Sequence, residues 1–543
     1  MQELFIEYIF LILMILALVM LANKLRIAYP IVLVLGGLLL SFFSVFTNIS
    51  IDPDLVFFIF LPPLLYEASW QVSWKEFWKW RRVITSFAFP IVIITAFSVA
   101  WVSHWLIPGF TLAMGFLLGG IVSPPDAVSA TTIMRQVSVP RSLRSIIEGE
   151  SLLNDSSSLI VFRFALAAVI TGQFRFSEAF FTFLMVVLTG IVIGLAVGLL
   201  FYAIHRWLPT TTSIEIVLTL VAPYCMYYAA EHFHYSGVLA VVSGGLFLSG
   251  KRQTMLSYRS RIEGGNVWTN TVFVLNGLVF LLIGLQLPSI TRQLGNISFT
   301  TALGYGLLIS LALLFTRFLC TFGTALFTQV VSRFITVADP NPGWKAPLIT
   351  GWAGMRGVVS LAAALSIPVT LSDGRAFPYR NLVLFITFIV ILVTLVLQGL
   401  TLPWIIRKVK MEDRFSPYSE QKQEIIIQKK VAQSSLQFLD ERFGGNAFPN
   451  DYIGNLYAKL LLDSNAFVQQ VNEATTGDGQ ALKSFQSVYL EMLEWQRQML
   501  NDMNQRSEFD EDLIRKYLSL IDIEEYKFRE KLLYTGSSNM PEE

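Results

Sequence analysis

The residues best suited to chemistry lie within fifteen letters, GESLLNDSSSLIVFR, which begin at Gly149. Ser151, Asn154 and Asp155 stand at positions i, i+3 and i+4, so a helix places a hydroxyl, an amide and a carboxylate on one face. The oxygen atoms of such groups suit a hard monovalent cation. The surrounding sequence is apolar, and a charge at the centre of a bilayer costs about 2.5–3.5 kcal/mol. Charged residues that remain in such a sequence despite this free-energy cost indicate a binding site.

Two other stretches place a charge where a helix must break. The sequence SPPDAV from Ser123 contains two prolines that remove backbone donors, so Asp126 is expected at the N-cap of a new half-helix. The helix dipole favours an anion there. The sequence GWAGMRGVV from Gly351 is also interrupted, and we expect Arg356 to balance the carbonyl end of a half-helix.

More charges lie in apolar sequence. Glu67 follows the proline-broken LPPLLY and is either an interfacial carboxylate or an acidic wall beside Asp155. Arg317, within FTRFLC, needs a buried carboxylate, and Glu150 is the predicted partner in a structural ion pair. Arg163 is expected to form a salt bridge or to extend outward to water.

The composition indicates that membrane-spanning helices position these residues. The chain has 543 residues, of which 54% are hydrophobic and 15% are charged, as in a polytopic membrane protein. A net charge of +1 gives no sign of a nucleic-acid partner. The sequence lacks a GxxxxGK[ST] motif for ATP and a Cys/His cluster for a metal. We therefore expect gradient-driven transport without a cofactor, and no enzymatic activity.

Apolar runs long enough to cross a core of about 30 Å predict thirteen spans. They begin near residues 4, 30, 55, 82, 111, 142, 178, 213, 236, 267, 301, 345 and 381. With the N-terminus outside, sixteen Lys and Arg residues fall in the inner loops and four in the outer loops, namely Arg175, Arg292, Arg375 and Arg380. The positive-inside rule therefore places the C-terminus in the cytoplasm.

A short repeat divides the spans into two sets of six. GGLLLS at Gly36 reappears as GGLFLS at Gly244, and this offset pairs the two interrupted spans. One helix between the sets, at about 178–207, reverses the second set, so the repeats of about 1–171 and 213–408 have inverted topology. The predicted fold is all-α, with about thirteen transmembrane helices and two crossing broken helices in residues 1–410. Amphipathic sequence in 411–543 predicts a cytoplasmic helical domain.

Three motifs carry a family resemblance. SPPDAV at Ser123, GESLLND at Gly149 and GMRGVVSLAAAL at Gly354 together resemble the sodium/proton exchangers, in the bacterial NhaP-like branch of the monovalent cation:proton antiporters. The resemblance covers about residues 1–410. It implies a homodimer in the bacterial inner membrane, an elevator-like movement of a core domain against a dimerisation domain, and exchange of sodium for protons in pH and sodium homeostasis.

The resemblance also implies the binding residues. Asp155 would bind the cation and the proton in turn, with Asn154 beside it. Ser151 and Glu67 would be neighbouring oxygen ligands of the monovalent cation. The Asn-Asp dipeptide at Asn154 resembles the branch that exchanges one cation for one proton without net charge.

Two charged pairs match the family as well. Glu150 and Arg317 match its core ion pair, and Asp126 and Arg356 match its crossover pair. Relatives usually have Thr where this chain has Pro125. The Pro125 carbonyl can still coordinate a cation, but the hydroxyl is missing, which bears on the ion preference.

Three alternatives remain open from the sequence. Potassium or lithium could replace sodium as the exchanged ion. A cation channel would also line its path with carboxylates, but it predicts several rings of charge. An intramembrane protease would use Asp126 and Asp155 as a dyad that shares a proton. The expected position of Asp126 at the N-terminus of a half-helix favours its ionised form, and this argues against a protease.

Overall fold

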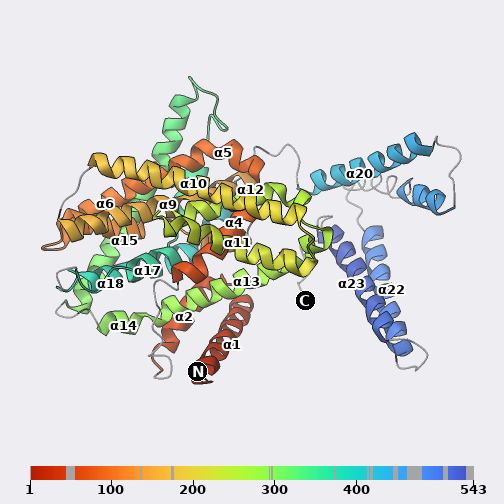
Figure 1. The fold of residues 1–543 in the computed structure, drawn as a ribbon, viewed down its shortest axis with the longest axis horizontal. Coiled ribbons are helices and arrows are strands. Elements are labelled where there is room, and N and C mark those ends of the chain that lie inside the picture. The colour runs from red at the N-terminus through yellow and green to blue at the C-terminus, as the bar shows by residue number, and fades with distance from the viewer. Residues whose placement is uncertain are drawn as a thin grey trace. The chain divides into compact units, whose positions relative to one another are not determined.

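Figure 1 shows the computed structural model, which divides into two compact units, Met1–Asp413 and Arg414–Glu543. The structure describes residues 2–43, 56–134, 137, 139–172, 176–292, 294, 297–371, 375–411, 415, 420–443, 451–461, 480–504 and 511–533. These residues form helices, turns and one isolated β-bridge between Thr370 and Ala376. The predicted all-α fold is confirmed.

The helices of the first unit follow the predicted apolar runs. They are α1 (Gln2–Leu25), α2 (Tyr29–Leu40), η2 (Val56–Phe60), α4 (Leu61–Gln71), α5 (Trp74–Ser86), η3 (Phe87–Ile91), α6 (Val92–Leu106), α7 (Leu112–Val122), α8 (Ala127–Met134), α9 (Arg141–Thr171), α10 (Phe176–Trp207), α11 (Thr212–His232), α12 (Gly237–Met255), α13 (Tyr258–Leu285), α14 (Leu287–Arg292), α15 (Phe299–Val331), α16 (Lys345–Trp352), α17 (Val358–Leu365), α18 (Arg380–Val393), η4 (Thr394–Gln398) and α19 (Gly399–Val409). The start of the run near residue 55 and the predicted outer-loop residue Arg175 lie outside the described residues.

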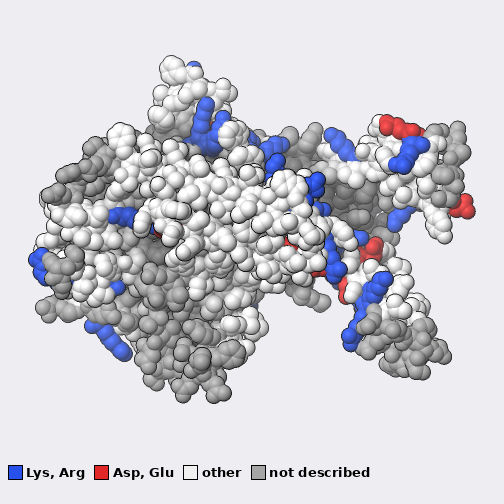
Figure 2. Space-filling model, viewed as in Figure 1, with Lys and Arg blue, Asp and Glu red and all other residues white. Residues whose placement is uncertain are grey.

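Much of the first unit is apolar enough for a bilayer. In the described part of the chain, eight helical stretches have the length and composition to cross a membrane, and α2 and most of α1 are shorter apolar helices. Figure 2 shows a face of this unit that is mostly free of Lys, Arg, Asp and Glu. The chain is therefore a multi-pass membrane protein, and the number of thirteen crossings stays a prediction.

Two hydrophobic clusters hold the first unit together. The larger cluster joins buried residues of α1, α2, α6–α9, α13 and α15–α19. The smaller cluster joins α4 and α10–α12. Helix α9 contributes Phe162 to the larger cluster and Leu152 to the smaller one. It therefore lies at the boundary between the two groups of helices.

Paired glycines bring helices of the two predicted repeats into close contact. A Cβ on Gly37 of α2 would collide with the Leu281 carbonyl of α13. A Cβ on Gly245 of α12 would lie 2.9 Å from the Cβ of Ser69 on α4. Both glycines belong to the repeated GGL motif, so α2 packs on α13 as α12 packs on α4. This correspondence is what an inverted repeat predicts.

The second unit contains α20 (Glu420–Phe443), α22 (Gln480–Asn504) and α23 (Glu511–Leu533). Helices α22 and α23 pair through Tyr489 and Phe528, whose ring centroids lie 4.2 Å apart. Arg497 of α22 forms ion pairs with Asp522, at 2.9 Å, and with Glu525 of α23. These contacts hold the two helices together as a hairpin.

Candidate functional site

A cavity of about 400 Å³ lies between two walls of the first unit. One wall is formed by α8, α9 and α17, and its lining includes Asp126, Ser151 and Asp155. The facing wall is formed mainly by α4 and α13, with Glu67 and Asn276 among its lining residues. Predicted site residues from distant parts of the sequence therefore share one cavity.

Asp155 lies on the α9 wall of this cavity. It is 7% exposed, and among the described residues we find no group that donates a hydrogen bond to its carboxylate. A buried ionised carboxylate without a partner is unfavourable. The geometry therefore favours a bound proton or a bound cation at Asp155.

Ser151 and Asn154 hold the break before α8. The backbone nitrogen of Ala127 donates to Ser151 Oγ at 3.1 Å, and Asn154 Nδ2 donates to the carbonyl of Pro125 at 2.8 Å. Ser151 lines the cavity, whereas the fully buried Asn154 and Pro125 are not among its lining residues. The structure thus brings Ser151 and Asp155 to the cavity and directs the Asn154 amide to the backbone behind it.

The breaks of the two interrupted helices touch each other. The backbone nitrogen of Asp126 donates to the carbonyl of Met355 at 2.6 Å. The Asp126 carboxylate accepts hydrogen bonds of 3.0 Å from the nitrogen of Val128 and from Ser129 Oγ, so it caps α8. A Cβ on Gly357 would lie 2.5 Å from that carboxylate, so this crossing requires glycine.

Arg356 completes the crossing from the other break. Its guanidinium, in a residue 1% exposed, donates from Nε to the Val122 carbonyl at 2.9 Å and from Nη2 to the Ser123 carbonyl at 3.3 Å. It also binds the Gly354 carbonyl, and its backbone nitrogen donates to Thr394 Oγ1 at 3.1 Å. The guanidinium therefore donates hydrogen bonds to carbonyl groups at the end of α7. Its positive charge lies at the negative end of the helix dipole.

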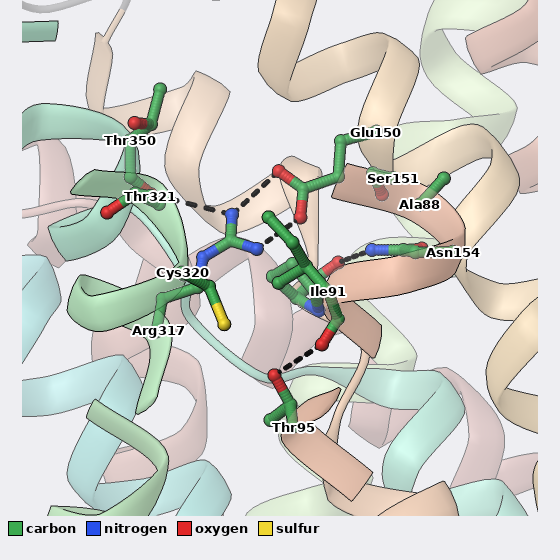
Figure 3. Close-up of polar contacts among 12 residues, drawn as sticks. Ala88, Ile91, Thr95, Glu150, Ser151, Asn154, Arg317, Cys320, Thr321 and Thr350 are labelled. Carbon is green, nitrogen blue, oxygen red and sulfur yellow. Dashed lines mark hydrogen bonds and ion pairs between the residues drawn. The ribbon is translucent and has the colours of Figure 1, made fainter. Parts of the chain in front are cut away.

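Glu150 and Arg317 form a bidentate ion pair beside the crossing (Figure 3). Arg317 Nη2 lies 2.6 Å from Glu150 Oε2, and the two side chains are 2–3% exposed. Arg317 Nη2 also lies 3.5 Å from the Thr350 carbonyl, and the guanidinium sits over the Phe87 ring. The pair therefore ties α9, which carries Asp155, to α15 and α16.

The α4 and α13 wall also carries polar groups. Glu67 of α4 accepts a hydrogen bond from Gln71 Nε2, one turn later. Asn276 of α13 was not predicted from the sequence, although a lone amide in the apolar run VFVLNGLVF was a visible signal. A second cavity, of about 170 Å³, shares Glu67, Gln71 and Thr269 with the first and continues toward the start of α13.

Arg163 joins α9 to the other group of helices. Its Nη2 lies 2.7 Å from Glu231 Oε2 on α11, which fits the expected salt bridge. The other oxygen of Glu231 accepts from the backbone nitrogen of Gly237 at 3.1 Å, at the start of α12. This carboxylate therefore connects three helices.

Comparison with known proteins identifies the family. The family model for the transmembrane region of the sodium/hydrogen exchanger matches residues 10–408. A sodium, potassium, lithium and rubidium/proton antiporter of Bacillus pumilus is 33% identical over 396 residues, which are 70% of this chain and 58% of that protein. An uncharacterised sodium/proton exchanger of Escherichia coli, YjcE, is 30% identical over 443 residues, which are 78% of this chain and 80% of that one.

The fold agrees with these sequence matches. The sodium proton antiporter MjNhaP1 of Methanocaldococcus jannaschii aligns with 76% of this chain and all of its own, with a TM-score of 0.58 and 18% identity. The chain spans a little under three fifths of the Bacillus protein, 58% of its length. From the extent of the family match and the shared fold, the chain belongs to the sodium/hydrogen exchanger family.

Proposed function

We propose that the protein exchanges a monovalent cation, sodium in the first instance, for a proton across the cytoplasmic membrane. The observation that carries this proposal is Asp155, a buried carboxylate that lines a cavity and that receives no hydrogen bond from the residues the structure describes. Ser151 on the same wall and Glu67 on the facing wall supply further oxygen atoms for the cation.

Coupling follows from competition at one carboxylate. A protonated Asp155 is neutral, and a cation-loaded Asp155 is compensated, so either form can be moved past an apolar barrier. The bare anion is costly to move. The proton and the cation must each bind more tightly to the conformation that moves past the barrier than to the other conformations. This differential affinity links the flux of the cation to the flux of the proton.

The names of relatives support the choice of sodium and other monovalent cations as the exchanged ions. The Bacillus pumilus relative is named as an antiporter of sodium, potassium, lithium and rubidium, and a relative in Synechocystis, 32% identical over 391 residues, as a low-affinity sodium/proton antiporter. Sodium is therefore the first ion to test, and potassium/proton antiport is the second candidate.

We further propose 1:1 electroneutral exchange, because the residue beside Asp155 is the neutral Asn154. The cavity between the α8–α9–α17 wall and the α4–α13 wall fits an elevator-like movement of the first wall against the second. A homodimer in the bacterial inner membrane, with the N-terminus outside and residues 411–543 in the cytoplasm, completes the proposal.

The test is exchange by the purified protein in proteoliposomes, with each cation and over a range of pH. Asp155→Asn keeps the shape of the side chain and removes its charge, so exchange should disappear while folding is kept. An imposed membrane potential should leave the parent rate unchanged. Exchange that persists in Asp155→Asn would exclude the assigned site, and a rate that follows the potential would exclude electroneutrality. Cation flux without proton counterflow would instead support a channel.

A further inference from the structure

Asn276 is a buried amide on the wall that faces Asp155. It is 4% exposed and lines the cavity, and its Oδ1 has no hydrogen-bond partner among the described residues. Buried polar atoms in folded proteins almost always have a partner, and exceptions often mark a bound water, an ion or a functional role. Placing a polar side chain within an apolar membrane helix also carries a free-energy cost.

The place of Asn276 along α13 puts its amide group beside the proposed path of the ion. Four residues at helical spacing line the cavity: Thr269, Val272, Phe273 and Asn276. Beyond Asn276 the same helix presents Val279, Leu282 and Ile283 to apolar residues of α17, around a space of only about 10 Å³. Asn276 is therefore the last polar group of α13 before an apolar seal closes the cavity.

The repeat supplies an independent reason to place a cation-facing group here. Glu67 follows Gly36 by 31 residues, and Asn276 follows Gly244 by 32. Their helices correspond, because α4 packs on α12 as α13 packs on α2. The two repeats thus direct Glu67 and Asn276, from corresponding helices of this wall, into the same cavity.

We propose that Asn276 provides an oxygen ligand to the transported monovalent cation from the wall opposite Asp155. This inference rests on the proposed exchange function. A half-turn about the Cβ–Cγ bond exchanges the two ends of the amide, which brings Oδ1 to the cavity. An amide oxygen is a hard, neutral ligand, and it does not titrate. It stabilises the cation-bound state of the site but not the protonated state, so it biases the competition at Asp155 toward the cation.

The test compares variants at Asn276 with a matched control in proteoliposomes. Asn276→Ala removes the oxygen, and the KM for sodium should rise about tenfold, as for the loss of a polar contact to a charged group. At a fixed sodium concentration, the acid side of the activity profile should move to higher pH by up to about one unit, since protons then compete better. Asn276→Asp keeps the oxygen and replaces the NH2 donor with a second oxygen that can carry negative charge, so its KM should stay near or below that of the parent.

Gln398 is the matched control. It is a fully buried amide whose side-chain oxygen and nitrogen both lack partners in the described part of the chain, and it does not line the cavity. Gln398→Leu should leave the KM and the pH profile unchanged. A parent KM in Asn276→Ala would overturn the proposal, and so would an Asn276→Asp variant as weak as Asn276→Ala, because the donor would then be the important group.

A binding measurement separates this proposal from the proposed function. Sodium chloride, compared with choline chloride, should raise the Tm of the detergent-purified parent, and it should raise the Tm of Asn276→Ala less at the same concentration. A parent that exchanges ions while both proteins show equal sodium-dependent Tm shifts would refute the ligand and leave exchange standing. A parent that binds sodium but does not exchange it would refute exchange, and a smaller shift in Asn276→Ala would still support the ligand.

Discussion

Removing one partner of the Glu150–Arg317 pair should destabilise the membrane unit strongly. Both side chains are 2–3% exposed, and two guanidinium nitrogens meet the two carboxylate oxygens. Arg317→Met would leave the Glu150 carboxylate buried and unpaired. Breaking a pair in such surroundings costs about 3–5 kcal/mol, which is a factor of more than about one hundred in the folding equilibrium.

The assay is a double-mutant cycle on heated, detergent-purified protein, in which the fraction that stays monodisperse is measured by size-exclusion chromatography. Glu150→Gln and Arg317→Met should each lower the midpoint of the transition. The double variant should be less damaged than the sum of the single variants, by at least about 2 kcal/mol, because no lone buried charge remains.

The exposed pair of Arg259 and Glu263 is a suitable control. Their atoms lie 2.6 Å apart at positions i and i+4, but the side chains are 67% and 46% exposed. Arg259→Met should therefore have little effect on the midpoint of the transition. Strict additivity of the Glu150 and Arg317 variants, or a loss no larger than that of Arg259→Met, would refute the reasoning about burial.

Three further outcomes are expected. Arg356→Met should lower the thermal midpoint by the equivalent of about 2–4 kcal/mol, because the carbonyls at the end of α7 lose their donor, and Arg356→Lys should restore little since one ammonium cannot reproduce the fork. In the second unit, burial raises the pKa of Glu525, but hydrogen bonds from Arg529 and Arg497 outweigh it, so the pKa lies below its ordinary value. The stability from this carboxylate is therefore present at neutral pH and lost as the pH falls through the folded pKa. Hydrogen exchange in α22 and α23 should be slower in the parent than in Glu525→Gln at pH 7, and this difference should shrink as the pH is lowered. A chain ending at Met411 should still exchange ions in vesicles, because every candidate ion ligand lies before that residue, and a folded, dimeric truncate without exchange would contradict this expectation.

The helix breaks were readable from sequence because their causes are local. Two prolines in SPPDAV remove backbone donors whatever surrounds them, and an aspartate after them suits a helix N-terminus. Arg317 pointed to a carboxylate for an equally simple reason, since a lone buried cation is unfavourable. Such arguments need only the chemistry of one turn.

The division of work among the site residues depends on tertiary contacts instead. Helical spacing places Ser151, Asn154 and Asp155 within one face, and it cannot tell which of them meets the cavity and which meets the Pro125 carbonyl. Asn276 Oδ1 has no hydrogen-bond partner among the described residues, so its role could be inferred only from the cavity that it shares with Asp155.

One helix extends beyond the apolar run that predicted it. The apolar run was predicted to begin near residue 82, whereas the helical stretch begins at Trp74. The sequence WKEFWKWRR is helical but too polar to be found by hydropathy alone. Ser73 starts this helix by accepting a hydrogen bond from Glu76 N, and Trp80 turns its ring inward.

The hydrogen bond between Asp126 and Met355 has a consequence for the energetics of the transport cycle. It joins the two interrupted helices at their breaks, and Asn154 joins the helix of Asp155 to the same place through Pro125. In the proposed elevator-like movement, the backbone dipoles around the carboxylate would keep one orientation while these bonds persist. The protein then contributes little reorganisation energy when one guest replaces the other. The free-energy cost of the replacement then comes from removing water molecules from the cation and from transferring the proton to its acceptor. The rate of exchange should therefore depend on the hydration energy of the ion.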